Sequence, residues 1–298
     1  GIGAAIHGWA PEEILARYAG DDKPLSVLVA VLCGVPLYAK TAYPTSQGDG
    51  LLLGLSAGGA IVGGDKYASL PGLVPDAFQY PCQMFAYAPL NPSIRAPWEI
   101  LVNARGERFV REDHPSVHHI ERGVYQQPAH RHWAIFDAAM LERSEPIIPK
   151  WTRERLANEH QSHAMFHSAM SVEALALRAG LNPLALQSTV DDYNRRLQQG
   201  KEDTFGRKMR PAPLSTPPYY SIAMQGWTLV SFAGLKVSVD LQVLRKGGEA
   251  IPNLYAIGEV IGAGATSGAA YTNGMLVTPA ITFGRILGTK LARASLSR

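Results

Sequence analysis

The sequence has little cysteine, little net charge and no long apolar run. Cys33 and Cys82 are its only cysteines, which excludes a disulfide framework and favours a reducing, cytoplasmic location. The 28 basic and 25 acidic residues leave a formal net charge of +3, so nucleic acid is not expected as a partner. No apolar stretch approaches the roughly 18 residues of a membrane helix, because Gly34 and Pro36 interrupt the most apolar run, residues 25–39. A membrane span is therefore not expected.

The composition is that of a folded globular chain. Hydrophobic residues make up 46% of the 298 positions, which is enough for one large domain or two ordinary ones. The 29 glycines and 21 prolines predict many turns. The apolar run 25–39 is interpreted as a buried strand or helix, with a subunit contact as the alternative.

Apolar periodicity and turn residues predict both helices and strands, as in an α/β chain. Helix caps are the clearest signal, because Ser171 and Asn182-Pro183 precede helical patterns that Gly180 and Gly200 end. The expected helices lie at 11–20, 51–55, 171–180, 182–200 and 276–291, and the expected strands at 60–62, 100–103, 108–110, 133–137, 234–240 and 254–258.

The segment from Leu254 to Leu291 carries the strongest chemical signal. A strand leads through a loop of small residues, 262–274, into a helix, so that backbone N–H groups can point at an electron-rich ligand atom. Glu259 follows the strand and would lie beside a ligand at the carboxyl edge of a parallel sheet. Such units also occur with a packing role alone, and the pattern by itself leaves both interpretations open.

Several segments, in the correct order, resemble FAD-dependent oxidoreductases. Residues 253–260, 262–274 and 282–288 resemble the C-terminal signature of the group that contains fumarate reductase and succinate dehydrogenase flavoproteins, 3-ketosteroid dehydrogenases and tricarballylate dehydrogenase. The further matches are 48–50 with the TGDG turn of that family, 102–112 with its "VN..G.RF..E" hairpin, 181–194 with its "DPxxLxxTVxxYN" helix pair and 233–240 with its "GGLxxxxD" strand. Together these matches span nearly the whole chain.

The resemblance implies a split architecture. Residues 1–65 and 222–298 would be parts of a Rossmann-like FAD-binding domain, and residues 66–221 an inserted α+β cap domain that closes over the substrate. The GxGxxG segment that holds the ADP half of FAD in this family has no counterpart in the sequence. An N-terminal FAD-binding segment is therefore expected in cis or as a separate chain, and the chain alone is expected to hold FAD weakly or not at all.

The resemblance also assigns cofactor contacts. Glu259 matches a ribityl-binding Glu, and the backbone of Leu276 and Val277 would face N1 and O2 of the flavin. At a helix N-terminus these groups would stabilise the anionic reduced flavin. The remaining candidate contacts are Asp49, Gly258 and Gly274.

The substrate positions depart from those of fumarate reductases. The charged groups that would bind a dicarboxylate are replaced by Leu70, Leu229, Val230 and Tyr271. Fumarate or succinate is therefore not expected as the substrate. The neutral hydroxyl of Tyr271 suits a carbonyl or hydroxyl group and could act as an acid.

Three residues are candidates for proton transfer. The stretch 114–119 reads HPSVHH where that branch has a proton-donating Arg, so His118 or His119 would replace it, with Tyr271 as the third candidate. Tyr67 and Ser231 lie in segments that flank the substrate in the family. The plainer alternatives are a core tyrosine and solvent-exposed or packing histidines.

A metal site is the weaker interpretation of the histidines. His160, His163 and His167 could share a helix face, but no HExxH pattern occurs and no cysteine lies nearby. No metal is expected.

These patterns together predict the C-terminal portion of a flavin-dependent dehydrogenase or reductase. Hydride would be exchanged between FAD and a small organic substrate that a carbonyl or acid group activates. The alternative is a cofactor-free fragment that serves as a binding or assembly module. Visible absorption by bound flavin would distinguish the two.

Overall fold

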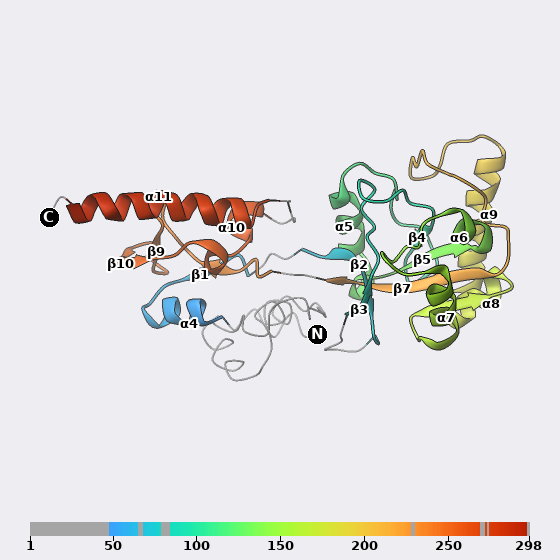
Figure 1. The fold of residues 1–298 in the computed structure, drawn as a ribbon, viewed down its shortest axis with the longest axis horizontal. Helices are drawn as coiled ribbons and strands as arrows, with labels where there is room; N and C mark the ends of the chain where they lie inside the picture. Colours follow the sequence, from blue (N-terminus) through green and yellow to red (C-terminus); the bar gives the residue numbers. More distant parts are fainter. Residues whose placement is uncertain are drawn as a thin grey trace. The chain divides into compact units, whose positions relative to one another are not determined.

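The computed structural model describes residues 48–64, 68–78, 84–227, 230–268, 272 and 274–296. The chain divides into two compact units (Figure 1). The terminal unit comprises Gly1–Ala68 and Thr228–Arg298, and the central unit comprises Ser69–Trp227. The boundary expected after residue 221 falls inside a strand, because β7 continues the central sheet through Trp227. The helix expected at 11–20 and the apolar run 25–39 lie outside the described residues.

The central unit is built on a six-stranded sheet of order β3-β2-β7-β5-β4, in which β6 also pairs with β7. The strands are β2 (Leu70–Pro75), β3 (Met84–Tyr87), β4 (Ile100–Val102), β5 (Arg131–Asp137), β6 (Phe166–Ala169) and β7 (Tyr219–Trp227). β7 pairs with β5 along the whole length of β5, from Arg131↔Gln225 to Asp137↔Tyr219. Its other edge carries β2 and β6, and all of these pairings are antiparallel (Figure 1).

Helices flank this sheet and enclose a continuous apolar core. They are α5 (Val117–Tyr125), η1 (Pro128–His130), α6 (Ala138–Arg143), α7 (Arg153–Ser162), α8 (Val172–Ala179) and α9 (Pro183–Gln198). Two predicted caps are confirmed: the Ser171 hydroxyl accepts the Ala174 N–H, and the Asn182 side chain accepts the Ala185 N–H. Gly180 ends α8 in the left-handed conformation that glycine favours.

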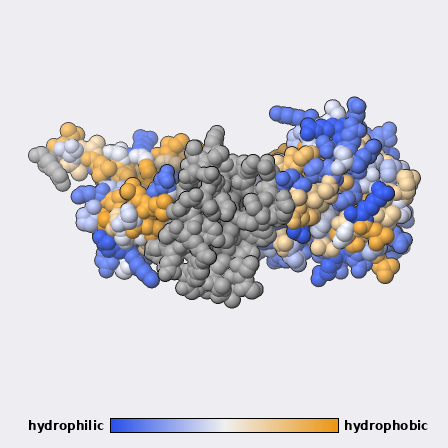
Figure 2. All heavy atoms as spheres, turned by 90° about the horizontal axis from the view of Figure 1, so that it is seen from below, coloured by the Kyte–Doolittle hydropathy of each residue, from blue (hydrophilic) through white to orange (hydrophobic). Residues whose placement is uncertain are grey.

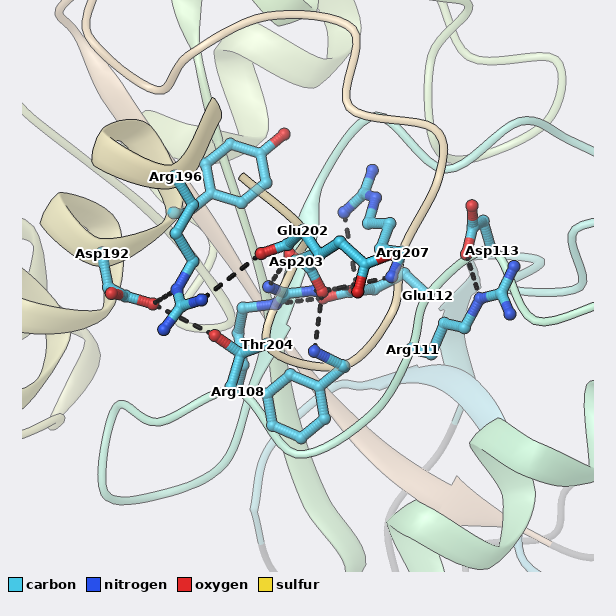
Figure 3. Close-up of polar contacts among 12 residues, drawn as sticks. Arg108, Arg111, Glu112, Asp113, Asp192, Arg196, Glu202, Asp203, Thr204 and Arg207 are labelled. Carbon is cyan, nitrogen blue, oxygen red and sulfur yellow. Dashed lines mark hydrogen bonds and ion pairs between the residues drawn. The ribbon is translucent and has the colours of Figure 1, made fainter. Parts of the chain in front are cut away.

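A buried ionic network ties the loop after α9 to the 103–112 hairpin (Figure 3). The Arg108 guanidinium donates to Glu112 at 2.5 Å and to Asp203 at 2.6 Å. Burial alone would raise the pKa of Asp203, but its pairing with Arg108 lowers it. Arg207, fully buried, donates to the backbone carbonyls of Pro97, Glu99 and Met209. These contacts hold residues 108–110 in a loop with a single bridge, Val102↔Arg108, where a returning strand was expected.

The terminal unit contains two short antiparallel ladders, β1 with β8 and β9 with β10. Its elements are α4 (Asp49–Ser56), β1 (Ile61–Val62), β8 (Gly234–Leu235), β9 (Gln242–Leu244), β10 (Ala250–Tyr255), η2 (Gly258–Ile261), α10 (Gly264–Ser267) and α11 (Val277–Leu296). Its small core is Leu51, Leu235, Val243, Ile251, Ala256 and Ile261. Among the described residues, no helix combines the length and the apolar character that a membrane crossing requires.

Three expectations for this unit are wrong. The strand expected at 234–240 is only two residues long, because the Ser238 hydroxyl accepts the N–H groups of Asp240 and Gln242 and turns the chain. β10 pairs antiparallel with β9, so the described pairings include no parallel sheet edge beside Glu259. Leu291, expected on the packed face of the last helix, is 42% exposed.

Candidate functional site

A cavity of about 320 Å³ lies in the terminal unit. It is formed by η2, α10, the first turns of α11 and the segment at Val230 and Ser231. Its walls are mainly apolar, and Ser231, Glu259 and Thr266 are the polar side chains among them. An apolar hollow with a few polar groups is typical of a small-molecule site.

Close backbone contacts build one wall of this cavity. Ala263 N–H donates to the Ser231 carbonyl at 2.9 Å, and Gly264 N–H donates to the Phe232 carbonyl at 3.2 Å. Gly262 has φ 78°, and a Cβ at this position would lie 2.4 Å from the Phe232 oxygen. Only glycine therefore allows the two segments to approach this closely.

Glu259 and the start of α11 give the cavity its electrostatic character. Among the lining residues that the structure describes, Glu259 is the one charged residue, and its exposed side chain has no hydrogen bond or ion pair with them or with the rest of the described chain. Leu276 and Val277 line the cavity at the N-terminal end of the 20-residue helix α11. The positive end of a helix dipole is therefore next to an acceptor-rich carboxylate.

These residues fit part of a flavin. Gly258, Gly262, Ala263 and Ala280 keep side-chain bulk away from the cavity, and a Cβ at Gly258 would meet only Ala280, at 3.9 Å. The volume is at the lower end of the range for ligand sites, which suits a planar ring system better than a whole dinucleotide.

Five of the candidate cofactor and substrate contacts line this one cavity. They are Ser231, Gly258, Glu259, Leu276 and Val277. Ser231, a candidate substrate contact, therefore lies with the cofactor candidates, and its hydroxyl donates to the Ala233 carbonyl at 2.8 Å.

Two further cofactor candidates, Gly274 and Asp49, are not among the lining residues of the cavity. The Gly274 carbonyl accepts the Thr278 N–H at 3.0 Å in the first turn of α11. Asp49 is the exposed first residue of α4, which meets η2 where a Cβ on Gly50 would lie 2.9 Å from Val260. Tyr67 and Tyr271 lie outside the described residues.

The two candidate histidines lie on α5 in the central unit. His118 Nδ1 pairs with the Glu121 carboxylate at 3.0 Å. His119 Nε2 accepts the Arg111 N–H at 3.1 Å, and its ring stacks on His114 with 4.3 Å between centroids. Burial lowers the pKa of His119, and the nearby His114 and Arg111 lower it further.

The histidines weighed as metal ligands do not share a helix face. His160 is on α7, His163 follows the end of that helix, and His167 is on β6. His160 is buried, and its Nδ1 lies 3.0 Å from the His167 carbonyl. No group of three or more His, Cys, Asp or Glu side chains arranged to hold a metal occurs in the part of the chain that the structure describes.

Sequence reasoning missed Thr266 as a structural element of the site. The Thr266 hydroxyl donates to the carbonyls of Ala263 and Met275, which ties α10 to the turn that precedes α11. From the sequence, 262–274 was interpreted only as a loop of small residues. The hydroxyl of Thr266 within it was the one sign that this residue could bond to a neighbouring segment. Met275 also lines the cavity and carries no sequence signal beyond apolarity, whereas Phe283 lies in the matched segment 282–288.

Comparison with known proteins identifies the sequence relatives. A family model described as FAD binding domain matches residues 32–274. A probable fumarate reductase of Shewanella frigidimarina is 24% identical over 85% of this chain and 40% of its own. A digoxin reductase of Eggerthella lenta is 37% identical over 42% of this chain and 22% of its own. A 3-oxosteroid 1-dehydrogenase of Mycobacterium tuberculosis is 26% identical over 80% of this chain and 46% of its own.

Solved structures show the same fold at low identity. A 3-ketosteroid Δ1-dehydrogenase from Sterolibacterium denitrificans has a TM-score of 0.68, with 22% identity over 95% of this chain and 51% of its own. The open conformation of a flavocytochrome c3 fumarate reductase has a TM-score of 0.57, with 22% identity over 93% of this chain and 43% of its own. The α/β class expected from the sequence is thereby confirmed as a flavoprotein fold. The chain spans less than half the length of the curated relatives named here.

Proposed function

Because the chain belongs to the FAD binding domain family, we propose that it is part of a flavin-dependent oxidoreductase. In this proposal the terminal unit forms one wall of the FAD site, and the central unit is the cap over the substrate. The observation that carries the proposal is the convergence of Ser231, Gly258, Glu259, Leu276 and Val277 on one cavity. FAD, when bound, supplies the capacity to accept or release a hydride.

The cavity residues have distinct roles in this proposal. The Glu259 carboxylate, without a partner among the described residues, accepts hydrogen bonds from ribityl hydroxyls. The N-terminal end of α11 at Leu276 and Val277 faces the electron-rich edge of the ring system.

The substrate is proposed to carry an uncharged carbonyl or hydroxyl group. Val230 lines the cavity at a position where the family resemblance places a charged group, and no basic residue is among the lining residues that the structure describes. Relatives named for 3-oxosteroids fit such a substrate. Tyr271, His118 and His119 remain proposed proton-transfer residues, and Tyr67 remains a proposed substrate contact.

A further segment of polypeptide is proposed to complete the FAD site. The seam on α11 formed by Val277, Ile281, Gly284, Gly288 and Leu291 repeats at intervals of four and three residues. Its larger members are 66%, 67% and 42% exposed, and hydrophobic residues reach the surface of this unit in Figure 2. Such a seam is typical of a helix that packs against more chain, in cis or in a separate polypeptide.

The same exposed seam favours a second candidate function, that of a cofactor-free binding or assembly module. In that case α11 would serve only as a contact surface, and the cavity would have no specific affinity for flavin. The two functions differ in their response to a substitution at Glu259.

Flavin titration tests the proposal. Riboflavin and FAD, followed by flavin fluorescence, are expected to bind the chain weakly, with a Kd on the order of 10 µM to 1 mM. Glu259→Gln is expected to weaken binding by about 10-fold, the loss of one charged hydrogen bond. Glu249→Gln, an exposed carboxylate on the β9–β10 hairpin, is the matched control and should bind as the parent does.

Either of two outcomes would contradict this picture. The absence of saturable binding, or equal binding by Glu259→Gln and the parent, would exclude the cavity as a flavin site. FAD retained in equal molar amount through dialysis would show that the chain needs no further segment.

A further inference from the structure

Ser69 and His130 form a buried hydrogen-bonded pair in the central unit. Ser69 Oγ lies 2.7 Å from His130 Nδ1, and the two residues are 1% and 6% exposed. Gly226 of β7 packs directly against the pair, since a Cβ there would lie 2.1 Å from Ser69 Oγ. Burial lowers the pKa of His130 to about 4, so the ring is neutral at pH 7 and is compatible with its apolar surroundings.

The backbone that carries His130 is strained. Ala129 and His130 have φ angles of 52° and 54°, in the left-handed region that residues with a side chain rarely adopt. Two such residues in succession persist only where surrounding contacts enforce them. One such contact is the Gln225 amide of β7, which donates to the Ala129 carbonyl. The surrounding contacts therefore keep the His130 side chain in place even though its backbone conformation is unfavourable.

The residues after Ser69 are held in a similar way. β2 has an irregular register with β7 between Leu70 and Leu73, as at a β-bulge. At this irregularity Gly72 N–H donates to His132 Nε2 at 3.3 Å, and Trp227 Nε1–H donates to the Pro71 carbonyl at 3.3 Å. Side chains thus replace ladder hydrogen bonds that the bulge removes.

This cluster stands where the chain enters and leaves the central unit. The unit begins at Ser69 and ends at Trp227, and Leu70, the first residue of β2, is the register partner of Trp227. Both connections to the terminal unit therefore leave from one pair of neighbouring strands, and His130 binds Ser69, the residue just before β2.

We propose that His130 is a positioning residue that holds the start of β2 and the end of β7 together, where the chain enters and leaves the central unit. The strand ends then stay part of the unit up to Ser69 and Trp227, and the unit moves as one body. This inference rests on the proposed function, in which the central unit acts as a cap that closes over a substrate. A cap carried on frayed strands would not return to a fixed position.

Hydrogen–deuterium exchange of the chain tests the inference without flavin or substrate. His130→Ala removes the bond to Ser69 and is expected to raise amide exchange over residues 69–73 by about 10-fold. His130→Asn is expected to restore slow exchange, because asparagine tolerates the left-handed conformation and its side-chain oxygen can accept the Ser69 hydroxyl.

The matched control is His160→Ala, which removes another buried histidine of the same unit. It is expected to lower global stability without a selective change at residues 69–73. If His130→Ala and His160→Ala raise exchange at 69–73 equally, or if His130→Asn fails to restore it, the inference is overturned. That result would leave the flavin site untouched, whereas a failed flavin titration would leave the exchange result valid.

Discussion

At the scale of single residues, the two histidines proposed to move a proton differ in what they contact. His118 pairs with the Glu121 carboxylate, whereas His119 uses Nε2 to accept a backbone N–H from Arg111. A ring nitrogen that accepts an N–H carries no proton of its own, so His119 is the neutral tautomer with its proton on Nδ1. The basic nitrogen of His119 is therefore occupied, and it can take up a proton only if the hydrogen bond from Arg111 breaks.

We therefore expect His119 to titrate below the usual range of histidine. Its pKa is lowered by burial first and by the stacked His114 next. Replacement of His114 by Gln removes that neighbour and should move the pKa of His119 upward. Long-range proton–nitrogen NMR spectra across a pH series measure the pKa of His119 in the parent and in His114→Gln. An unchanged pKa in His114→Gln would show that the two rings are not coupled.

At the scale of elements, the bulge of β2 depends on one glycine. Gly72 has φ 92°, and a Cβ there would lie 1.9 Å from the Ala88 carbonyl oxygen. Gly180 also has a positive φ, 70°, but a Cβ at that position meets no atom within 4 Å. A side chain at Gly72 would meet both a steric clash and an unfavourable φ, whereas one at Gly180 would meet the unfavourable φ alone.

Gly72→Ala is expected to destabilise the central unit by more than about 3 kcal/mol, whereas Gly180→Ala should cost about 1–2 kcal/mol. The larger loss in Gly72→Ala comes from the clash of the new methyl group with the carbonyl of Ala88, the residue after β3. Urea unfolding followed by tryptophan fluorescence measures both free energies of unfolding. Equal losses in the two variants would mean that β2 shifts to accommodate the methyl group.

The elements that local signals specify were predictable from the sequence, and those that depend on distant partners were not. Ser171 and Asn182 cap helices through bonds within three residues, so the pattern alone reveals them. β3 was missed because residues 66–100 have no clear period, and its pairing with β2 is a tertiary contact. The prediction of a strand at 108–110 was wrong for the same reason, because Arg108 is held by Asp203, which is distant in the sequence.

The candidate site shows a similar division. Gly258, Glu259, Leu276 and Val277 belong to one strand–loop–helix segment, so their proximity follows from the order of the elements. Thr266 acts through its fold-dependent bond to Met275, which no spacing rule predicts. Ser231 reaches the same cavity only because β8 and η2 are adjacent in space.

At the scale of the whole molecule, three buried histidines make the central unit sensitive to acid. Burial lowers the pKa of His130 and His132 to about 4 and that of His160 to about 3. In the unfolded chain the same groups titrate near 6.5, so between about pH 6.5 and pH 4 the unfolded state binds up to three more protons. The stability from these groups is therefore present above pH 6.5 and is lost as the pH falls.

The expected slope near pH 5 is about 4 kcal/mol per pH unit for three protons, at about 1.4 kcal/mol each. Urea unfolding at pH 7, 6 and 5 gives this slope, and His160→Gln should reduce it by about one proton. Carboxylates with lowered pKa, such as Asp203, add to the loss only at lower pH. A free energy of unfolding that stays constant from pH 6.5 to pH 5 would contradict the assignment of these histidines as neutral.

The charge of the cavity predicts which substrates the flavin-loaded protein does not turn over. Among the described residues that line the cavity, Glu259 is the one charged residue and Val230 presents an apolar side chain. A dicarboxylate would be repelled there and would find no cationic partner among these residues. We expect no turnover of fumarate with reduced methyl viologen as electron donor, and measurable turnover of an uncharged enone such as 4-androstene-3,17-dione. Oxidation of the dye, followed by absorbance, measures both rates, and heat-denatured protein gives the background. Fumarate reduction at a typical enzymatic rate, on the order of 10 per second, would show that cationic groups outside this cavity bind the substrate.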